Sequence, residues 1–202
     1  MNPETAAQIQ TVRKFGTYFH QLSLLAGALL VLVSVVSLLT IVAHPHASSL
    51  NVGLGAYTFT SDQMATLEIK AWSAVVVITV FATLLGVVLH LRRLFRNLAA
   101  GSIYTRDNVR HLRNVGTLAV AMAALQIVLP MITEVLVQTG FLDPTLLTFT
   151  EPRSRGIFLL GPSSLSAWIT AGLVLLASWI MDLGRQTTDE ANAMRREANL
   201  VI

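Results

Sequence analysis

The sequence predicts an all-α membrane protein, a bundle of four transmembrane helices with short β-strands in two of its loops. Three observations indicate this class. Hydrophobic residues make up 53% of the 202 residues and charged residues only 12%, about half the charged fraction of an average soluble domain. The mean hydropathy is +0.64. Four long apolar stretches alternate with polar segments along the whole chain.

Each apolar stretch is long enough to cross about 30 Å of hydrocarbon as a helix. We place the spans at about Leu22–Ala43, Ala71–Leu91, Val115–Thr139 and Ser164–Met181. The first span is longer than the apolar part of a signal peptide and follows a polar segment, so we expect it to be retained. Residues 1–202 then form a single four-span membrane domain.

The Lys and Arg residues are distributed unevenly between the loops. Eleven lie before the first span, between the second and third, or after the fourth, and three lie in the other two loops. Because basic loops stay on the cytoplasmic side of a membrane, we expect both termini to be cytoplasmic. The loop at 92–114, which we call the elbow, and the tail at 184–202 are then cytoplasmic as well.

Two longer loops, at about 44–70 and 140–163, lie on the opposite, outer side in this topology. Residues alternate between apolar and polar in Ala56–Thr60 and in Leu146–Thr150, and Gly156–Leu160 follows a turn-like segment. Such alternation predicts short strands. We expect a small sheet that caps the bundle.

The elbow predicts two helices joined by a tight turn. Gly101 follows "LRRLFRNLAA" and suits the left-handed conformation that often ends a helix. Thr105 suits the N-cap of the next helix. That helix, at Arg106–Asn114, carries three arginines on one face and Val109 and Leu112 on the other.

The tail predicts a further cytoplasmic helix. Thr187–Glu190 matches a capping box, in which Thr187 would begin a helix and Glu190 would reach back to it. Ala191, Met194 and Ala198 then form an apolar stripe, and the chain ends in "ANLVI". A helix of this kind lies on lipid, packs under the elbow or meets a partner.

The basic elbow admits three interpretations. A module that reads DNA needs a helix that is free to enter a groove, and this elbow is continuous with two spans, so we expect no direct nucleic-acid binding. Anionic headgroups of the lipid bilayer attract any basic segment. Lipid requires only positive charge, however, and the fixed order of Gly101, Thr105 and Asn108 favours a protein partner at those positions.

The segments "LFRNLAAGSIYTRDNVRHLRNVG" and "SWIMDLGRQTTDEANAMRREANLVI" resemble the bacterial membrane family known as domain of unknown function 2975. In this resemblance Tyr104 and Val115 replace a usual Phe and Ile, and Asn199 stands where an acid is common. The matching positions are Leu94, Phe95, Leu98, Gly101, Thr105, Asn108, Val109, Leu112, Arg113 and Gly116. The resemblance covers essentially the whole chain and implies four spans in the bacterial cytoplasmic (inner) membrane.

The family lacks an established activity. Its members are often encoded beside small Cro/C1-type helix-turn-helix regulators, which implies that the chain binds and restrains such a regulator. We therefore expect a regulatory or scaffolding protein. The candidate docking residues are Gly101, Thr105, Asn108, Val109, Leu112, Arg113, Met194 and Leu200.

An alternative function rests on Glu134, the only acid inside a predicted span. An ionisable residue in a membrane is a functional candidate, and it shares a polar stripe with Gln126, Pro130 and Gln138. This pattern suggests a small transporter coupled to protons or cations, which would need a homo-oligomer because four spans are few for a carrier. Glu134 also lies near the outer end of its span, where reaching the interface is a simpler role.

No catalytic pattern is present. The sequence contains no Gly-rich phosphate loop, no nucleophile–base pair and no cysteine. His44 and His46 form an isolated His-x-His pair, and a metal site needs further ligands. We expect no enzyme activity, no cofactor and no metal site.

Overall fold

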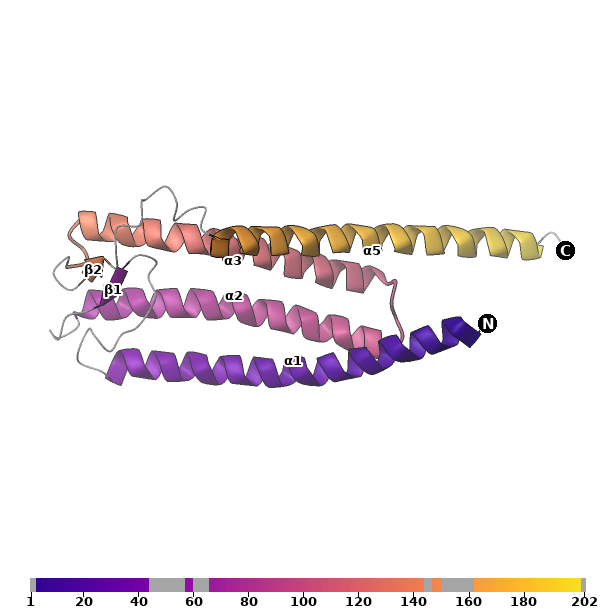
Figure 1. The fold of residues 1–202 in the computed structure, drawn as a ribbon, viewed down its shortest axis with the longest axis horizontal. Coiled ribbons are helices and arrows are strands. Elements are labelled where there is room, and N and C mark those ends of the chain that lie inside the picture. The colour runs from indigo at the N-terminus through magenta and orange to yellow at the C-terminus, as the bar shows by residue number, and fades with distance from the viewer. Residues whose placement is uncertain (1–2, 44–56, 60–65, 144–146, 150–161, 201–202) are drawn as a thin grey trace. The chain divides into compact units, whose positions relative to one another are not determined.

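The computed structural model describes residues 3–43, 57–59, 66–143, 147–149 and 162–200. These residues form four long helices and two short strands (Figure 1). In chain order the elements are α1 (Pro3–Ala43), β1 (Tyr57–Phe59), α2 (Leu67–Ala99), α3 (Arg106–Gln138), β2 (Leu147–Phe149) and α5 (Pro162–Leu200). The four helices are each long and apolar enough to cross a membrane, which confirms the all-helical, four-span class.

The helices are longer than the predicted spans. α1 begins at Pro3, and proline suits the first position of a helix because its missing N–H would have no partner there. α5 continues without a break to Leu200, well beyond the predicted end of the fourth span at Met181. Hydropathy predicts only the apolar part of a helix, so the polar extension of α1 was missed, and the predicted tail helix was not joined to the fourth span.

Several small or polar side chains are buried between the described helices, beside apolar ones, and many large apolar side chains are exposed. The fully buried side chains include Asn108, Thr133 and Ser73. Leucines and valines are widely exposed, with Leu67 as much as 79% accessible. Small and polar residues between helices with large apolar residues around them are the arrangement expected in lipid, which solvates the outer surface.

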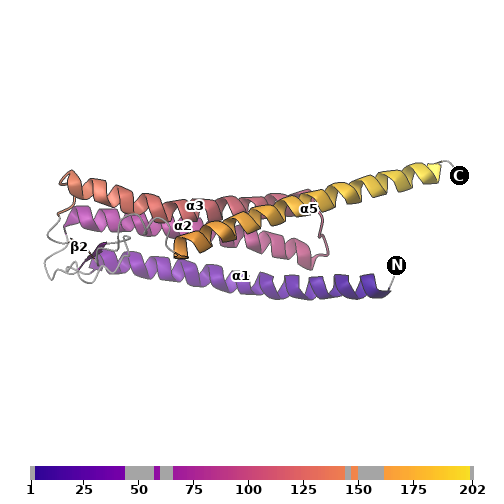
Figure 2. The same cartoon turned by 45° about the horizontal axis from the view of Figure 1, so that its top comes forward.

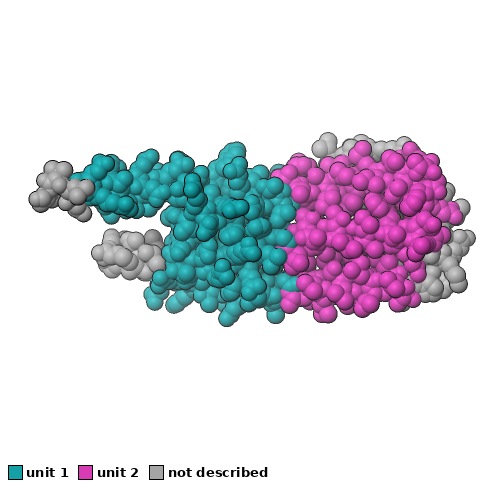
Figure 3. All heavy atoms as spheres, turned by 180° about the vertical axis from the view of Figure 1, so that it is seen from behind, with its two compact units in different colours: residues 1–27, 86–119, 169–202 teal, residues 28–85, 120–168 magenta. Residues whose placement is uncertain are grey.

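The chain divides into two compact units, coloured separately in Figure 3. Unit 1 contains residues 1–27, 86–119 and 169–202, and unit 2 contains residues 28–85 and 120–168. Each of the four helices contributes to both units.

Unit 2 has a small apolar core. Its buried members are Ile41, Ile69, Val76, Val77 and Leu142. Beside them, the Trp72 indole donates a hydrogen bond of 3.1 Å to Thr133 Oγ1, and Thr133 in turn donates to the carbonyl of Leu129. This contact joins α2 to α3, and it satisfies the indole N–H inside the unit.

The two strands also belong to unit 2. They pair antiparallel over three residues, with Tyr57 opposite Phe149 and Phe59 opposite Leu147. The flanking predicted residues and the whole predicted strand Gly156–Leu160 lie outside the described residues. One ladder of this length does not make an independently stable sheet, so the described fold is all-helical. The capping sheet stays a prediction.

Unit 1 holds α1, α2, α3 and α5 together through close approaches at glycine. Figures 1 and 2 both show the end of α2 beside the start of α3. A Cβ placed on Gly86 of α2 would lie 3.1 Å from the side chain of Leu118, and one on Gly116 of α3 would lie 2.6 Å from that of Leu175 in α5. Small residues let helices pack closely in lipid.

Candidate docking surface at the elbow

The first helix of the elbow, the end of α2, stops at Ala99, and Gly101 forms its C-terminal cap, as the sequence predicts. Gly101 has a φ of +82°, a conformation that only glycine adopts without strain. Its amide donates to the carbonyl of Leu98, and the amide of Ser102 donates to that of Asn97. This pair of bonds is the Schellman motif, which satisfies two carbonyls at the end of α2.

Arg13 of α1 covers this turn. Its Nη2 donates a hydrogen bond of 3.4 Å to the carbonyl of Ala100. The guanidinium lies so close to Gly101 that a Cβ there would be 2.7 Å from its Nε. A cation at the C-terminal end of a helix is favourable because the end carries partial negative charge. The N-terminal helix therefore helps to hold the elbow.

The second helix of the elbow begins after Thr105, also as predicted. Thr105 Oγ1 accepts a hydrogen bond of 3.3 Å from the amide of Asn108, and its carbonyl accepts one from the amide of Val109. These are the side-chain and backbone bonds of an N-cap. Thr105 is therefore the N-cap residue of α3.

Asn108 is fully buried and organises the turn from within. Its Nδ2 donates to the carbonyls of Ser102 and Ile103, the latter at 2.9 Å, and its Oδ1 accepts from Asn97 Nδ2 at 2.8 Å. Both amide hydrogens are used, and they satisfy carbonyls that the turn would otherwise leave without partners. With no accessible surface, Asn108 can act on a partner only through the shape of the elbow.

The remaining predicted docking residues of the elbow are distributed between its inside and its surface. Gly101, Thr105, Val109 and Leu112 are half-buried, and Arg113 is exposed. Arg106 and Arg110 are exposed on the same helix. The surface that the elbow offers is therefore mainly a row of guanidinium groups on a fixed backbone.

The elbow also contacts α5 through Tyr104. The ring of Tyr104 lies against Gly184, where a Cβ would be 3.0 Å from Cε1 of the ring. More than half of the Tyr104 side chain remains exposed. Beyond this contact, every described side chain of α5 from Gln186 to Ala198 is exposed. The tail thus leaves the bundle beside the turn of the elbow.

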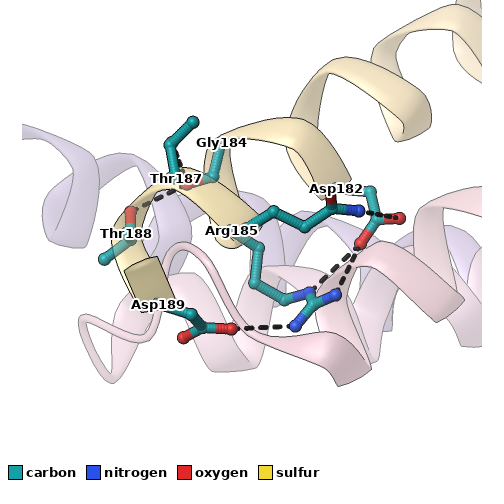
Figure 4. A network of polar contacts seen from close by, with 7 residues as sticks. Asp182, Gly184, Arg185, Thr187, Thr188 and Asp189 are labelled. Atoms are coloured by element: carbon teal, nitrogen blue, oxygen red, sulfur yellow. Dashed lines mark hydrogen bonds and ion pairs between the residues drawn. The ribbon is translucent and has the colours of Figure 1, made fainter. Parts of the chain in front are cut away.

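The predicted capping box at Thr187 is wrong, because α5 passes through these residues without a break. Thr187 and Thr188 instead donate to the carbonyl of Gly184 at 3.0 and 2.7 Å (Figure 4). Arg185 lies between Asp182 and Asp189 and bridges both carboxylates, at 3.1 and 2.9 Å. These contacts at helical spacing support continuation of the helix. A Thr-x-x-Glu pattern indicates the start of a helix only where the preceding residues are not already helical.

A family model described as "Protein of unknown function (DUF2975)" matches residues 17–202, which include every element described above except the first turns of α1. The chain belongs to this family. No curated protein and no solved structure matches it. The matched region contains the elbow of this DUF2975 chain together with α5 and its tail.

Three histidines of this DUF2975 chain lie near the elbow. The Nδ1 atoms of His90 in α2 and His111 in α3 are 3.2 Å apart, so one ring donates and the other accepts. His20 of α1 donates through Nδ1 to the carbonyl of Arg92 at 3.3 Å. Both contacts tie neighbouring helices together. Among the described residues, no three potential ligands are placed to hold a metal ion.

The polar stripe of α3 lies in unit 2. Gln126 and Gln138 are exposed, and Pro130 and Glu134 are half-buried. Gln138 Nε2 donates to Glu134 Oε1 at 3.4 Å, a contact between neighbouring turns of one helix. The transport hypothesis stays a prediction, and Glu134→Gln in a liposome flux assay would test it.

Sequence reasoning found the two caps but missed what surrounds them. Arg13 and Ala100 are 87 residues apart in the chain, and no local pattern links them. The contact between Tyr104 and Gly184 also joins residues far apart in the sequence. Leu200 ends α5, and its side chain lies outside the described residues.

Proposed function

We propose that this chain is a regulatory or scaffolding protein of the bacterial inner membrane. Its elbow, on the cytoplasmic side, docks a small helix-turn-helix transcriptional regulator. One observation carries the proposal: Asn108 and the turn at Gly101 fix the backbone of the elbow from within, while Arg106, Arg110 and Arg113 stay exposed on its surface. A surface with a fixed shape and unused charge suits a specific partner.

The row of arginines indicates the chemistry of that partner. Arg106, Arg110 and Arg113 are four and three residues apart and share a face, so their charges repel one another. No ion pair of these three is found among the described residues. An acidic protein surface would relieve the repulsion. Because a helix-turn-helix protein contacts DNA through a basic face, the elbow would bind a different, acidic face of the regulator.

Anionic lipid is the competing partner for these arginines. Lipid attracts basic residues near the membrane surface with about 1 kcal/mol each, whatever the shape of the segment that carries them. It gives no reason for a buried Asn108 with three side-chain contacts. The two partners can therefore be separated by changing the shape of the elbow and its charge independently.

The test measures binding of a purified Cro/C1-type helix-turn-helix regulator, of the kind encoded beside members of the family, to the intact chain in nanodiscs of zwitterionic lipid. Arg110→Glu changes the exposed charge, and Asn108→Ala changes the shape of the elbow. We expect both to weaken binding at least tenfold, on the order of 1.4 kcal/mol or more. Lys14→Glu, an equal charge reversal at an exposed position of α1 in the same unit, is the matched control and should bind as the unaltered chain does.

Thermal unfolding of each variant in detergent verifies that the chain remains folded. Asn108→Ala should leave the attraction of the chain to anionic lipid unchanged, because no charge is altered. Regulator binding that survives both Arg110→Glu and Asn108→Ala would reject the elbow as the docking surface. Loss of binding with Arg110→Glu alone would support a charge-only contact and reject the role of shape.

A further inference from the structure

The outward face of α5 repeats every seven residues. Small residues recur at a strict spacing of seven, and a second series follows the first four of them by three residues. The first series is Thr170, Ala177, Gly184, Ala191 and Ala198, and the second is Leu173, Ile180, Thr187 and Met194. These are the a and d positions of a heptad. A straight helix drifts by about 20° per heptad, so a repeat sustained over four heptads is typical of helices that wind around a partner helix.

Large side chains on this face are exposed within one chain. Leu173, Ile180 and Met194 are 60%, 63% and 64% exposed. The side of α5 that packs on the bundle is different, because Ala171 and Ser178 are buried there. At one position, Gly184, the ring of Tyr104 from the elbow lies alongside. The described seam residues on either side of Gly184, from Leu173 to Ala198, are exposed. We call the residues of the two series the α5 seam.

In the tail, beyond the bundle, nearly all apolar residues lie in the seam. Between Gln186 and Ala198 the seam holds Thr187, Ala191, Met194 and Ala198, and Ala193 is the single apolar residue off it. Lipid can solvate an apolar residue only within the bilayer. In the tail, therefore, another surface must pack against this stripe to shield it from water. A stripe of this width, two positions in seven, suits one partner helix.

Two charges beside the seam indicate which helix that is. Glu190 and Arg195 flank it, and neither has an opposite charge three or four residues away in its own helix. No ion pair of either is found in the described part of the chain. In a parallel two-stranded coiled coil, the residue just before an a position (position g) lies opposite a residue at position e of the other helix. That residue is five positions further along the sequence. Glu190 of one copy would therefore face Arg195 of a second copy.

We propose that two copies of this chain pair through their α5 helices as a parallel coiled coil along the α5 seam. Copies inserted the same way in one membrane have parallel α5 helices, which is the orientation that the Glu190–Arg195 pairing requires. Small residues at the a positions other than Gly184, where Tyr104 lies alongside, let the two backbones approach closely, and close approach drives association of helices in lipid. The same residue from each copy meets across a two-fold axis.

The charge of the tail disfavours a lipid surface as the cover. Three acidic and two basic residues lie between Gln186 and Ala198. Helices that rest on anionic lipid instead carry polar faces rich in Lys and Arg. The pairing is independent of the proposed docking of a regulator, and it places Met194 in the contact between copies instead of the docking surface.

Cysteine cross-linking tests the pairing directly, because the chain has no native cysteine. Single variants Ala191→Cys, Met194→Cys and Ala198→Cys place a thiol in the seam. Asn192→Cys, Ala193→Cys and Arg196→Cys place one at equally exposed positions of the same turns. After mild oxidation in native membranes, we expect a covalent dimer from the seam variants and monomer from the controls. Cross-linking at no position, or equally at all six, would overturn the proposal.

Charge reversal then tests the register. In the Ala191→Cys background, Glu190→Arg or Arg195→Glu alone should lower the cross-linked fraction, because like charges would face each other between copies. The double variant Glu190→Arg/Arg195→Glu should restore it. Failure of the double variant to restore cross-linking would overturn the parallel register. The regulator is left out of these preparations, so the outcome does not depend on the proposed docking function.

Discussion

Gly16 of α1 lies against the backbone of Ala99 in α2. A Cβ placed on Gly16 would be 2.6 Å from the amide nitrogen of Ala99, closer than any side chain could remain. Arg13, one turn earlier in α1, donates to the carbonyl of Ala100. The N-terminal helix is thus fitted to the end of α2 at two successive turns, and the elbow starts from a supported helix end.

Gly16→Ala should therefore destabilise the chain. The obstacle is backbone, which cannot rotate away, so α1 and α2 must separate, at a cost of about 1–3 kcal/mol. Gly27→Ala is the matched control, because its Cβ would lie 3.4 Å from a methyl group of Val88, an ordinary contact. SDS-induced unfolding in mixed micelles measures both. Equal stability of the two variants would show that the close approach at Gly16 is unimportant.

Gly101→Ala should cost more than Gly140→Ala. Both glycines have positive φ, +82° and +75°, and a Cβ in that conformation costs roughly 1–2 kcal/mol. At Gly140 nothing lies within 4 Å, whereas at Gly101 the Arg13 guanidinium must also move. A double-mutant cycle with Arg13→Ala isolates this second part. Its coupling energy should be clearly different from zero, and additive effects would contradict the contact.

Asn108→Ala should loosen the elbow. The change leaves the carbonyls of Ser102 and Ile103 without their side-chain donor, at roughly 1–3 kcal/mol for each buried group that stays unsatisfied. Amide hydrogen exchange of residues 101–109 should accelerate, while exchange in α5 stays unchanged. Arg110→Ala, exposed on the same helix, should leave exchange in this segment unaltered. Unchanged exchange in Asn108→Ala would refute its structural role.

Thr187→Ala should leave the tail helix as stable as before or make it slightly more stable. At a helix start, replacing a capping Thr by Ala costs about 1 kcal/mol. Thr187 lies inside α5, where alanine is the better helix former by a few tenths of a kcal/mol. We therefore expect tail amides in Thr187→Ala to exchange no faster than in the unaltered chain. Faster exchange from Thr188 onward would indicate that a helix begins there after all.

Much of this fold could be predicted from the sequence because hydropathy and capping are local signals. The four spans follow from runs of apolar residues. Gly101 and Thr105 follow from residue types whose backbone preferences act within a few positions, and both take the predicted roles. The class of the protein and the turn of the elbow therefore required no knowledge of distant contacts.

The rest depends on contacts between segments far apart in the chain. Asn108 reads as a polar surface residue on an amphipathic helix, and only the fold shows that two carbonyls and Asn97 surround it. The helical continuation through Thr187 was missed because its pattern also fits a helix start. What decides between the two is the preceding helix and the contacts of Arg185.

The absence of a break in α5 from Ile169 to Leu200 has a mechanical consequence. A continuous helix resists twisting, so a rotation of its apolar part about the helix axis would turn the tail through nearly the same angle. The ring of Tyr104 in the elbow packs against α5 at Gly184. Rotation of α5 about its axis would therefore push the Tyr104 ring and the elbow. A partner bound to the elbow would oppose that rotation.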